Sequence, residues 1–374
     1  MKVVCVEIIE TSIPLKKTYR LSRRAGDLQE TTPILVKIRT DDGIVGYGET
    51  DPWGIFTGET LGTVAAVLKE VLAPNIIGED PTNVNNINRI QDSLVRGNLM
   101  AKSAIEMACY DLLGKSLGIP VHGILGGALY KKMPIMGGIG GGSIEEVIES
   151  AKEVINNKYR SIMIKVGRDP VHDAEGVLAA RNILGKDFPI IIDANQGWDR
   201  PSAMKFINIA KEAEPVLFEQ PIDADDLEGL AEIRRRCDIP ISVDESLLSL
   251  RDAKEIMRLG AADVFSIKVC KHGGIKRSLE IIELAKSKGI TILFNSMIEE
   301  GITQAASLNI ALTVSNPFEF GHAFSSPLRL EADITSYSSL VKDGFVQKPE
   351  RPGLGVVLLE DVLEKYTLRK ETVS

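Results

Sequence analysis

Three acidic residues follow apolar runs at nearly equal spacing along the chain. Asp193 ends the run PIIID, Glu219 ends VLFE and Asp244 ends PISVD, at steps of 26 and 25 residues. Lysines continue the series on both sides, Lys165 in IMIKVG and Lys268 in VFSIKVC, at steps of 28 and 24 residues. A (β/α)₈ barrel spends about 250 residues on eight strand–helix units, so one unit takes about as many residues as one such step. The five residues are therefore predicted at the C-terminal ends of five successive strands, where barrel enzymes carry their active sites.

Three carboxylates at neighbouring strand ends repel one another unless a cation lies between them. Oxygen ligands suit a hard ion, and a few carboxylates completed by water and substrate oxygens are typical of Mg²⁺, with Mn²⁺ as a substitute. Such an ion could hold a substrate carboxylate and stabilise the enediolate that forms when its α-proton is removed. The simpler alternative is that each acid only caps the helix that follows it. Three matched acids in consecutive units favour the metal site.

A lysine that acts as a base needs a pKa lowered from about 10.4 to about 7–8. A nearby divalent cation and a desolvated barrel mouth both act in that direction. Lys165 and Lys268, on opposite sides of the metal, could remove a proton from one face of the substrate and return one to the other. The alternative for either lysine is a plain ion pair with a strand-end acid.

Apolar runs alternate with amphipathic stretches from about Lys132 onward, which predicts a parallel sheet covered by helices. Eight such runs predict closure into a TIM-like barrel of class α/β: PIMGGI, SIMIKV, PIIIDA, PVLFEQ, PISVDE, DVFSIKV, TILFNS and PFEFGH. A solenoid is the alternative, but no leucine or asparagine ladder recurs.

The chain divides into three predicted parts. Residues 1–130 contain strand-like runs such as KVVCVEIIE, then helical periodicity from Thr60, and so predict an α+β capping domain. Residues 131–325 form the predicted barrel. Residues 326–374 do not continue the repeat and are predicted to pack back on the capping domain.

Composition excludes several classes of protein. The 374 residues are 44% hydrophobic, enough for a large core, and the formal charge of −8 argues against a nucleic-acid partner. No apolar run approaches 18 residues and no signal segment is recognisable, so no membrane partner is expected and the predicted location is cytoplasmic. The four scattered cysteines lack CxxC spacing and are predicted to be reduced, structural thiols.

The phrases IKVG, DANQGW, FEQP, VDES and IKVCKHGGI together resemble the barrel signatures of the enolase superfamily, in its muconate-lactonizing-enzyme subgroup. PWGIFTGET resembles the subgroup's capping loop, SMIEEGI its seventh-strand segment and KDGFVQKPERPGLG its C-terminal return. Enolase-superfamily sites are a known example of lysine or histidine bases used with Mg²⁺ to stabilise an enediolate. The resemblance implies an enolase-type barrel enzyme that assembles as a homo-oligomer.

By this resemblance, Asp193, Glu219 and Asp244 are the metal ligands, and Lys165 and Lys268 are the acid/base pair. Trp53 and Arg23, with Arg20 and Arg24, lie in the N-terminal part and are expected to close over the substrate, although a solvated basic loop explains them equally well. The remaining candidates for contact with the metal or substrate are Asn195, Asn295, Ser296, Met297, Glu299, Glu319 and Met163.

The chain departs from the subgroup at three places. Met163 replaces the first lysine of the usual Lys-x-Lys. Glu300 replaces the serine of Glu-Ser-Gly, either as a partner for a substrate amine or as a helix first-turn residue. On the eighth strand, Glu319 to His322 (EFGH) replaces the Asp-x-Asp of dipeptide epimerases, although Glu319 matches a glutamate of the cycloisomerase pattern. His322 is interpreted as a hydrogen-bonded loop residue rather than an acid/base group.

The predicted function is Mg²⁺-dependent removal of the α-proton of a small-molecule carboxylate, with racemisation or epimerisation of an amino-acid derivative as the leading reaction. Cycloisomerisation of a muconate-type diacid and dehydration of a hydroxy acid or hydroxyproline are the alternatives, since fold does not choose among them. A Schiff-base lysine aldolase and a non-catalytic binding barrel are readings from other classes.

Met163 generates a prediction. Residues 163 and 165 point to the same side of a strand, so Met163 removes a cation beside the presumed base Lys165. A neighbouring cation lowers a lysine pKa, so Met163→Lys should carry activity to lower pH than the unchanged chain does. Superimposable pH–rate profiles of the two proteins would contradict this.

Overall fold

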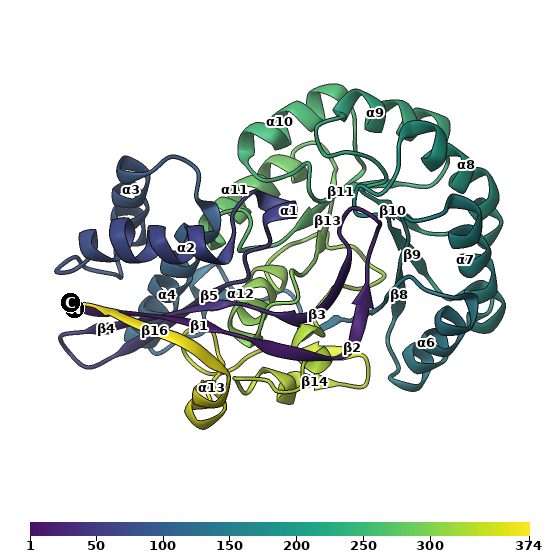
Figure 1. The fold of residues 1–374 in the computed structure, drawn as a ribbon. Coiled ribbons are helices and arrows are strands. Elements are labelled where there is room, and N and C mark those ends of the chain that lie inside the picture. The colour runs from purple at the N-terminus through teal and green to yellow at the C-terminus, as the bar shows by residue number, and fades with distance from the viewer.

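The computed structural model describes all residues, 1–374. Its N-terminal part is built on an antiparallel sheet in the order β16-β1-β4-β5 (Figure 1). The strands of this sheet are β1 (Val3–Thr11), β4 (Ile34–Thr40), β5 (Val45–Thr50) and β16 (Thr367–Val373). The helices beside it are α1 (Gly54–Thr57), α2 (Leu61–Val67), which continues as a π-helical turn (Leu68–Leu72), α3 (Val84–Leu94) and α4 (Leu99–Leu117).

Helix α4 packs directly on β5. A Cβ atom on Gly48 would lie 1.7 Å from the carbonyl oxygen of Ala104, so only glycine permits this approach of strand and helix. Most of α4 is buried, which explains why its sequence is apolar on nearly all sides. No helix combines the length and the hydropathy that crossing a membrane would need.

A hairpin of β2 (Ile13–Arg20) and β3 (Asp27–Thr31) leaves the N-terminal sheet and reaches over the second part of the molecule (Figure 1). At its tip, the Ser22 hydroxyl donates to the carbonyl of Asn195 at 2.9 Å, and the Arg23 amide donates to the carbonyl of Gly167 at 3.1 Å. The hairpin is therefore fixed to loops that follow two barrel strands.

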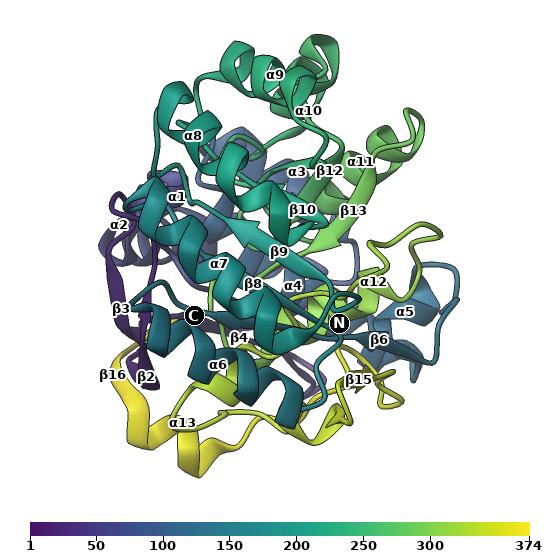
Figure 2. The ribbon, with the colours of Figure 1, turned by 90° about the vertical axis from the view of Figure 1, so that its right-hand side faces the viewer.

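The second part is a curled sheet of seven parallel strands in the order β13-β12-β11-β10-β9-β8-β7. Figures 1 and 2 show helices around the outside of this sheet. The strands are β7 (Met136–Ile139), β8 (Ser161–Lys165), β9 (Ile190–Asp193), β10 (Leu217–Glu219), β11 (Ile241–Val243), β12 (Val264–Ile267) and β13 (Thr291–Phe294). The helices are α6 (Ile144–Asn156), α7 (Pro170–Leu184), α8 (Arg200–Ala210), α9 (Leu227–Arg236), α10 (Leu250–Leu259), α11 (Ile275–Lys286) and α12 (Gly301–Ala311). The short helix α5 (Val121–Ile124) precedes the sheet.

The prediction of a regular eighth strand is wrong. Its segment makes only two single-residue bridges, Pro317 to Ile292 of β13 and His322 to Ile135 before β7. Pro317 has no N–H to donate, and Gly321 has a φ of 123°, so a continuous ladder cannot form here. The two bridges still connect β13 to β7, and the enolase-type barrel is confirmed in this form.

The C-terminal residues contact both parts. β15 (Phe345–Gln347) pairs with β14 (Val341–Lys342) and with β6 (Lys132–Pro134), while β16 pairs with β1 in the N-terminal sheet. Between them, α13 (Glu360–Tyr366) starts with Glu360, whose carboxylate lies 2.6 Å from the ammonium of Lys37. The boundaries predicted near residues 130 and 325 stay predictions.

Two carboxylates of the N-terminal part bind the N-termini of barrel helices. Glu106 of α4 accepts from the amides of Ile275 and Lys276 at 2.7 and 2.8 Å, at the start of α11. Glu49 of β5 accepts from the amides of Glu300 and Thr303 at 2.5 and 2.8 Å, at the start of α12. Each carboxylate satisfies N–H groups that the helix cannot satisfy itself. These bonds hold the two parts in one arrangement.

Candidate active site

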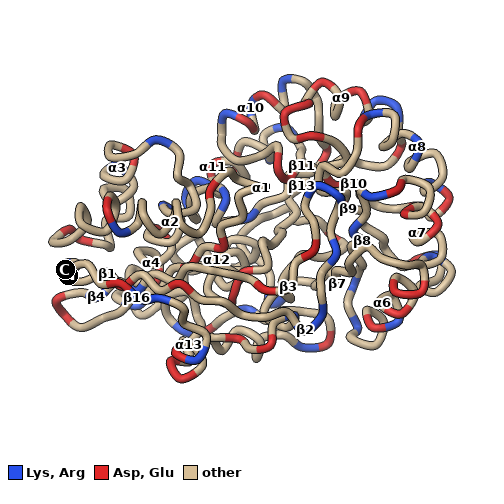
Figure 3. Tube along the Cα trace, viewed as in Figure 1, with Lys and Arg blue, Asp and Glu red and all other residues tan.

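The charged residues lie directly above an apolar layer inside the barrel. That layer contains Met136, Met163, Ile191, Leu217, Val264, Leu293 and Phe318. Two residues further along their strands come Lys165 after Met163, Asp193 after Ile191, and Glu219 after Leu217. Because side chains alternate along a strand, these groups point to the same interior side as the apolar layer. Figure 3 shows acidic and basic residues along the chain trace near β9, β10 and β11.

Each predicted lysine is paired with an aspartate. The Lys165 ammonium donates to Asp193 on the adjacent strand, and the Lys268 ammonium lies 2.6 Å from Asp244. Burial lowers the pKa of both lysines, but the aspartate charges outweigh it and the pKa of each is raised. A base role therefore requires another cation to take up the aspartate charges.

Lys271 is a third buried cation that the sequence analysis missed. Its ammonium lies 2.5 Å from Oδ1 of Asp244 and 2.6 Å from the Asp244 carbonyl oxygen. Burial lowers the pKa of Lys271. Although burial acts in the opposite direction on Asp244, the charges of Lys268 and Lys271 lower the pKa of this carboxyl. Lys271 lies three residues after Lys268 in KVCK, and only the turn that follows β12 brings the two together.

Glu219 is buried with one oxygen unpaired. Its Oε1 accepts from Nδ2 of Asn295 at 2.7 Å, whereas Oε2 has no partner. Burial raises the pKa of Glu219 well above its ordinary range, and the charges of Asp193 and Asp244 raise it further. A buried carboxylate in this state is stable only as the neutral acid or beside a cation.

Glu245 is a buried carboxylate that the sequence analysis missed. Its Oε1 accepts from Nδ2 of Asn195 at 3.2 Å, and burial raises its pKa to about 8. The backbone N–H of Asn195 donates to Oδ1 of Asp193 at 2.8 Å, while the side-chain Oδ1 of Asn195 has no partner. Asn195 has a φ of 38° and Ile298, in the loop after β13, a φ of 69°. Positive φ is strained for the β-branched Ile298, whereas asparagine tolerates it, and such strain concentrates at functional sites.

The donor set fits a hard divalent cation. Asp193, Glu219, Asp244 and Glu245 supply only oxygen, and the unpaired Oε2 of Glu219 is an available ligand atom. As the side chains lie, no three acidic, histidine or cysteine residues are arranged to hold an ion. Ammonium groups of Lys165, Lys268 and Lys271 instead contact the oxygens of Asp193 and Asp244. Cation binding at these carboxylates requires Lys165 and Lys268 to move off them.

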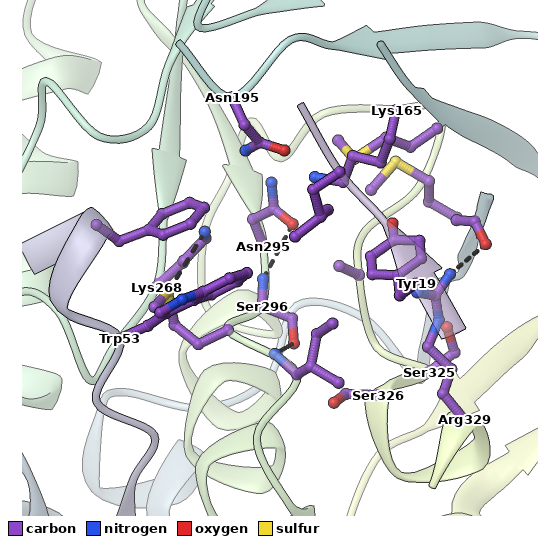
Figure 4. A pocket seen from close by; sticks show the side chains of 18 residues that line it. Tyr19, Trp53, Lys165, Asn195, Lys268, Asn295, Ser296, Ser325, Ser326 and Arg329 are labelled. Atoms are coloured by element: carbon purple, nitrogen blue, oxygen red, sulfur yellow. Dashed lines mark hydrogen bonds between the residues drawn. The ribbon is translucent and has the colours of Figure 1, made fainter. Parts of the chain in front are cut away.

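A cavity of about 50 Å³ opens between the two lysines. Figure 4 shows Lys165 and Lys268 on opposite sides, with Asn195 and Asn295 between them. The predicted residues that line it are Trp53, Met163, Lys165, Asn195, Lys268, Asn295, Ser296 and Met297. The lining residues that the sequence analysis missed are Tyr19, Leu21, Phe56, Met136, Gly138, Ile298, Ala323, Ser325, Ser326 and Arg329. No aspartate or glutamate lines the cavity.

Several candidates lie elsewhere. Arg23 lines a separate shallow depression with Arg168, and Arg20 and Arg24 form ion pairs with Glu146 and Asp223 at the barrel rim. Glu319 is exposed and outside the cavity, because Phe318 before it points into the barrel and the next side chain points away. These placements do not support substrate contacts for Arg23 or Glu319.

His322 is a buried structural residue. Its Nδ1 accepts from the Phe294 amide at 3.1 Å, so the ring carries no proton at that nitrogen, and burial lowers its pKa to about 3. It does not line the cavity. The interpretation as a hydrogen-bonded loop residue fits this placement.

Glu299 and Glu300 form a buried acidic cluster with Glu49 and Asp51, and none of these residues lines the cavity. Glu299 accepts from the Ser296 hydroxyl at 2.9 Å and from the side chain of Gln304 at 2.7 Å, which holds the loop after β13. Glu300 precedes α12, is fully buried, and has no partner for Oε1. Burial raises the pKa of Glu49 to about 8 and that of Asp51 to about 7. Glu300 thus faces other acids and not the cavity, which argues against contact with a substrate amine.

The comparisons with known proteins agree along the whole chain. Residues 146–362 match the family described as enolase C-terminal domain-like, and residues 5–126 match the mandelate racemase / muconate lactonizing enzyme N-terminal domain. The chain belongs to this family. The predicted superfamily and fold class are thereby confirmed.

Three relatives are informative. N-succinyl-L-Arg/Lys racemase of Bacillus cereus is 32% identical over 374 residues, 100% of both chains, and its crystal structure has a TM-score of 0.95 at 31% identity and full coverage. Muconate cycloisomerase 1 of Rhodococcus opacus is 32% identical over 98% of this chain and 99% of its own. A dipeptide epimerase of Cytophaga hutchinsonii, complexed with Mg and D-Ala-L-Val, has a TM-score of 0.93 at 27% identity with full coverage of both chains. The relatives are isomerases, as the sequence analysis predicts for this chain.

The acidic cluster generates a prediction for stability. In the folded protein the buried Glu49 keeps its proton up to a pKa of about 8, whereas in the unfolded chain it loses the proton near its ordinary pKa of 4.5. The free energy of unfolding therefore falls as the pH rises toward 8. Burial, followed by the charges of Glu49 and Asp333, raises the pKa of Glu300 well above its ordinary range. Glu300→Gln should therefore lose less stability between about pH 5 and 9 than the unchanged protein, by about 1 kcal/mol or more.

Urea unfolding at both pH values measures this difference. Glu149→Gln, at an exposed position of α6, serves as the matched control and should follow the unchanged protein. If the Glu300→Gln protein loses as much stability as the control, the charge of Glu300 does not govern this pH dependence.

Proposed function

We propose that the protein racemises or epimerises an N-acylated amino acid by removing and returning its α-proton. The observation that carries the proposal is the position of Lys165 and Lys268 on opposite sides of one cavity (Figure 4). A proton taken from one face and replaced from the other inverts the configuration at one carbon. Two bases on opposite faces are the arrangement that this reaction needs.

The proposed roles follow from the contacts. Asp193, Glu219 and Asp244 would hold Mg²⁺, or Mn²⁺ in its place. The ion, when bound, would neutralise the negative charge that develops on the substrate carboxylate as the α-proton leaves. Lys165 would exchange the proton at one face and Lys268 at the other, each released from its aspartate. Asn295 would orient Glu219 and Asn195 would orient Asp193 through the hydrogen bonds described above.

The lining of the cavity supports an acylated substrate. A free substrate ammonium would need a buried counter-charge, and no carboxylate lines the cavity. The segment that replaces Asp-x-Asp offers only an exposed Glu319 and a buried His322. An amide nitrogen carries no charge and needs no such partner. The racemase of B. cereus acts on N-succinyl amino acids, which is the same class.

Cycloisomerisation of a muconate-type diacid is the second candidate. The same lack of cavity acids suits a diacid, and the R. opacus relative is as similar in sequence as the racemase. A Schiff-base lysine is less consistent with the contacts, because that mechanism needs no metal and so supplies no cation to release Lys165 or Lys268 from its aspartate and lower its raised pKa.

α-Proton exchange in D₂O, followed by NMR, tests the proposal. The substrates are N-acyl amino acids, dipeptides, hydroxyprolines and muconate, each with Mg²⁺. We expect exchange at the α-carbon of the N-acyl amino acids, its loss with EDTA and its recovery when Mg²⁺ is restored. Exchange that persists in EDTA would contradict the role of the metal, and turnover of muconate alone would favour the second candidate.

A further inference from the structure

Arg329 differs from the other cations of the cavity. It ends the short helical turn η4 (Ser326–Arg329), and one of its N–H groups donates to the carbonyl of Gly138. No carboxylate pairs with its guanidinium, whereas Lys165 and Lys268 each pair with an aspartate. A guanidinium has five N–H donors in a planar fork that matches a carboxylate, so most of its donors remain free.

Gly138 leaves room for the guanidinium of Arg329. A Cβ atom at Gly138 would lie 2.4 Å from Nη2 of Arg329 and 3.0 Å from the Tyr19 hydroxyl, so any larger residue would displace the guanidinium. The Arg329 guanidinium carbon lies 4.2 Å from the centre of the Tyr19 ring, and the Lys165 ammonium lies 5.9 Å from the same centre. Tyr19 therefore lies beside two cations, the proposed base Lys165 and Arg329 (Figure 4).

A second cavity is lined in part by the same residues. It measures about 260 Å³, against about 50 Å³ for the inner one, and the two share Tyr19, Gly138, Ser325 and Arg329. Arg329 therefore lies at the boundary of the two cavities, at the opposite end of the inner cavity from Lys268. There it can meet the far end of a substrate whose reacting carboxylate lies between the lysines.

We propose that Arg329 binds a second carboxylate of the substrate, so that the substrate is a dicarboxylate. This inference rests on the proposed function, which places the reacting carboxylate between the lysines. The second carboxylate comes from a dicarboxylic acyl arm, from an acidic side chain or from a diacid such as muconate. In each case it pairs with Arg329 beside Tyr19, while the apolar lining contacts the chain between the two carboxylates.

Matched pairs of substrates test the proposal. N-succinyl-L-leucine is compared with its terminal amide, and N-acetyl-L-glutamate with N-acetyl-L-glutamine, by kcat/KM for α-proton exchange. The unchanged protein should prefer the acid by about 10- to 100-fold in the pair whose arm reaches Arg329, as for a charge-assisted hydrogen bond. The pair that shows the preference identifies the arm.

Substitution then assigns the preference to Arg329. In Arg329→Met the ratio should fall to about one, mainly through a higher KM for the acid, and Arg329→Lys should keep an intermediate ratio. Arg89→Met, an exposed arginine of α3, is the matched control and should keep the full ratio. An unchanged ratio in Arg329→Met, or no preference in the unchanged protein for either pair, would overturn the proposal.

Direct binding separates this test from the proposed function. If no N-acyl amino acid exchanges its α-proton, the proposed function fails. Calorimetric titration of muconate and of its monoamide, with Mg²⁺ present, still tests Arg329. Weaker binding of the diacid to Arg329→Met, with unchanged binding of the monoamide, would support the second-carboxylate site. Equal binding of both compounds to both proteins would overturn it.

Discussion

The structure depends on the burial of three carboxylates at neighbouring strand ends with a lysine on either side of them. Asp193 and Asp244 are each bonded to a lysine, and Glu219 lies between them with one oxygen unpaired. Removing either partner of the Lys165–Asp193 pair leaves a buried charge uncompensated, at a cost of about 3–5 kcal/mol, whereas Asp244 is also bonded to Lys271. Such a site is stable only with its full set of charges, and the lysines can act as bases only if another cation replaces them on the aspartates. The stability of the folded site and the proposed reaction therefore both require a cation beside Asp193 and Asp244.

The N-terminal part completes the site rather than only covering it. Tyr19, Leu21, Trp53 and Phe56 come from this part and line the cavity, with Tyr19 near Lys165 and Phe56 near Lys268. Glu49 and Glu106 bind the starts of α12 and α11, the helices that follow the strands leading to Asn295 and Lys268. A change in the position of the N-terminal part is thus passed to residues that contact the substrate in the proposed reaction.

Much of the barrel could be predicted from the sequence, because regular strands obey simple rules. The spacing of one strand–helix unit and the alternation along each strand place Lys165, Asp193 and Glu219 on one interior surface. The same alternation places Glu319 outside the barrel, because Phe318 before it points inward, and the resemblance to a cycloisomerase glutamate was no guide to its position. Arg329 and Tyr19 could not be predicted, since they belong to a short turn and a hairpin with no periodicity, and only the folded chain brings them together. Lys271 and Glu245 stand beside recognised residues, but their burial depends on turns whose conformation the sequence pattern does not determine.

The most direct test of the two-base account follows deuterium at the α-carbon of each enantiomer of an exchanging substrate, by mass spectrometry. The unchanged protein should label both enantiomers. Lys165→Ala should retain exchange with one enantiomer and Lys268→Ala with the other, because each remaining lysine still reaches its own face. Loss of exchange with both enantiomers in one variant, together with full exchange in the other, would show that a single lysine serves both faces and would contradict the account.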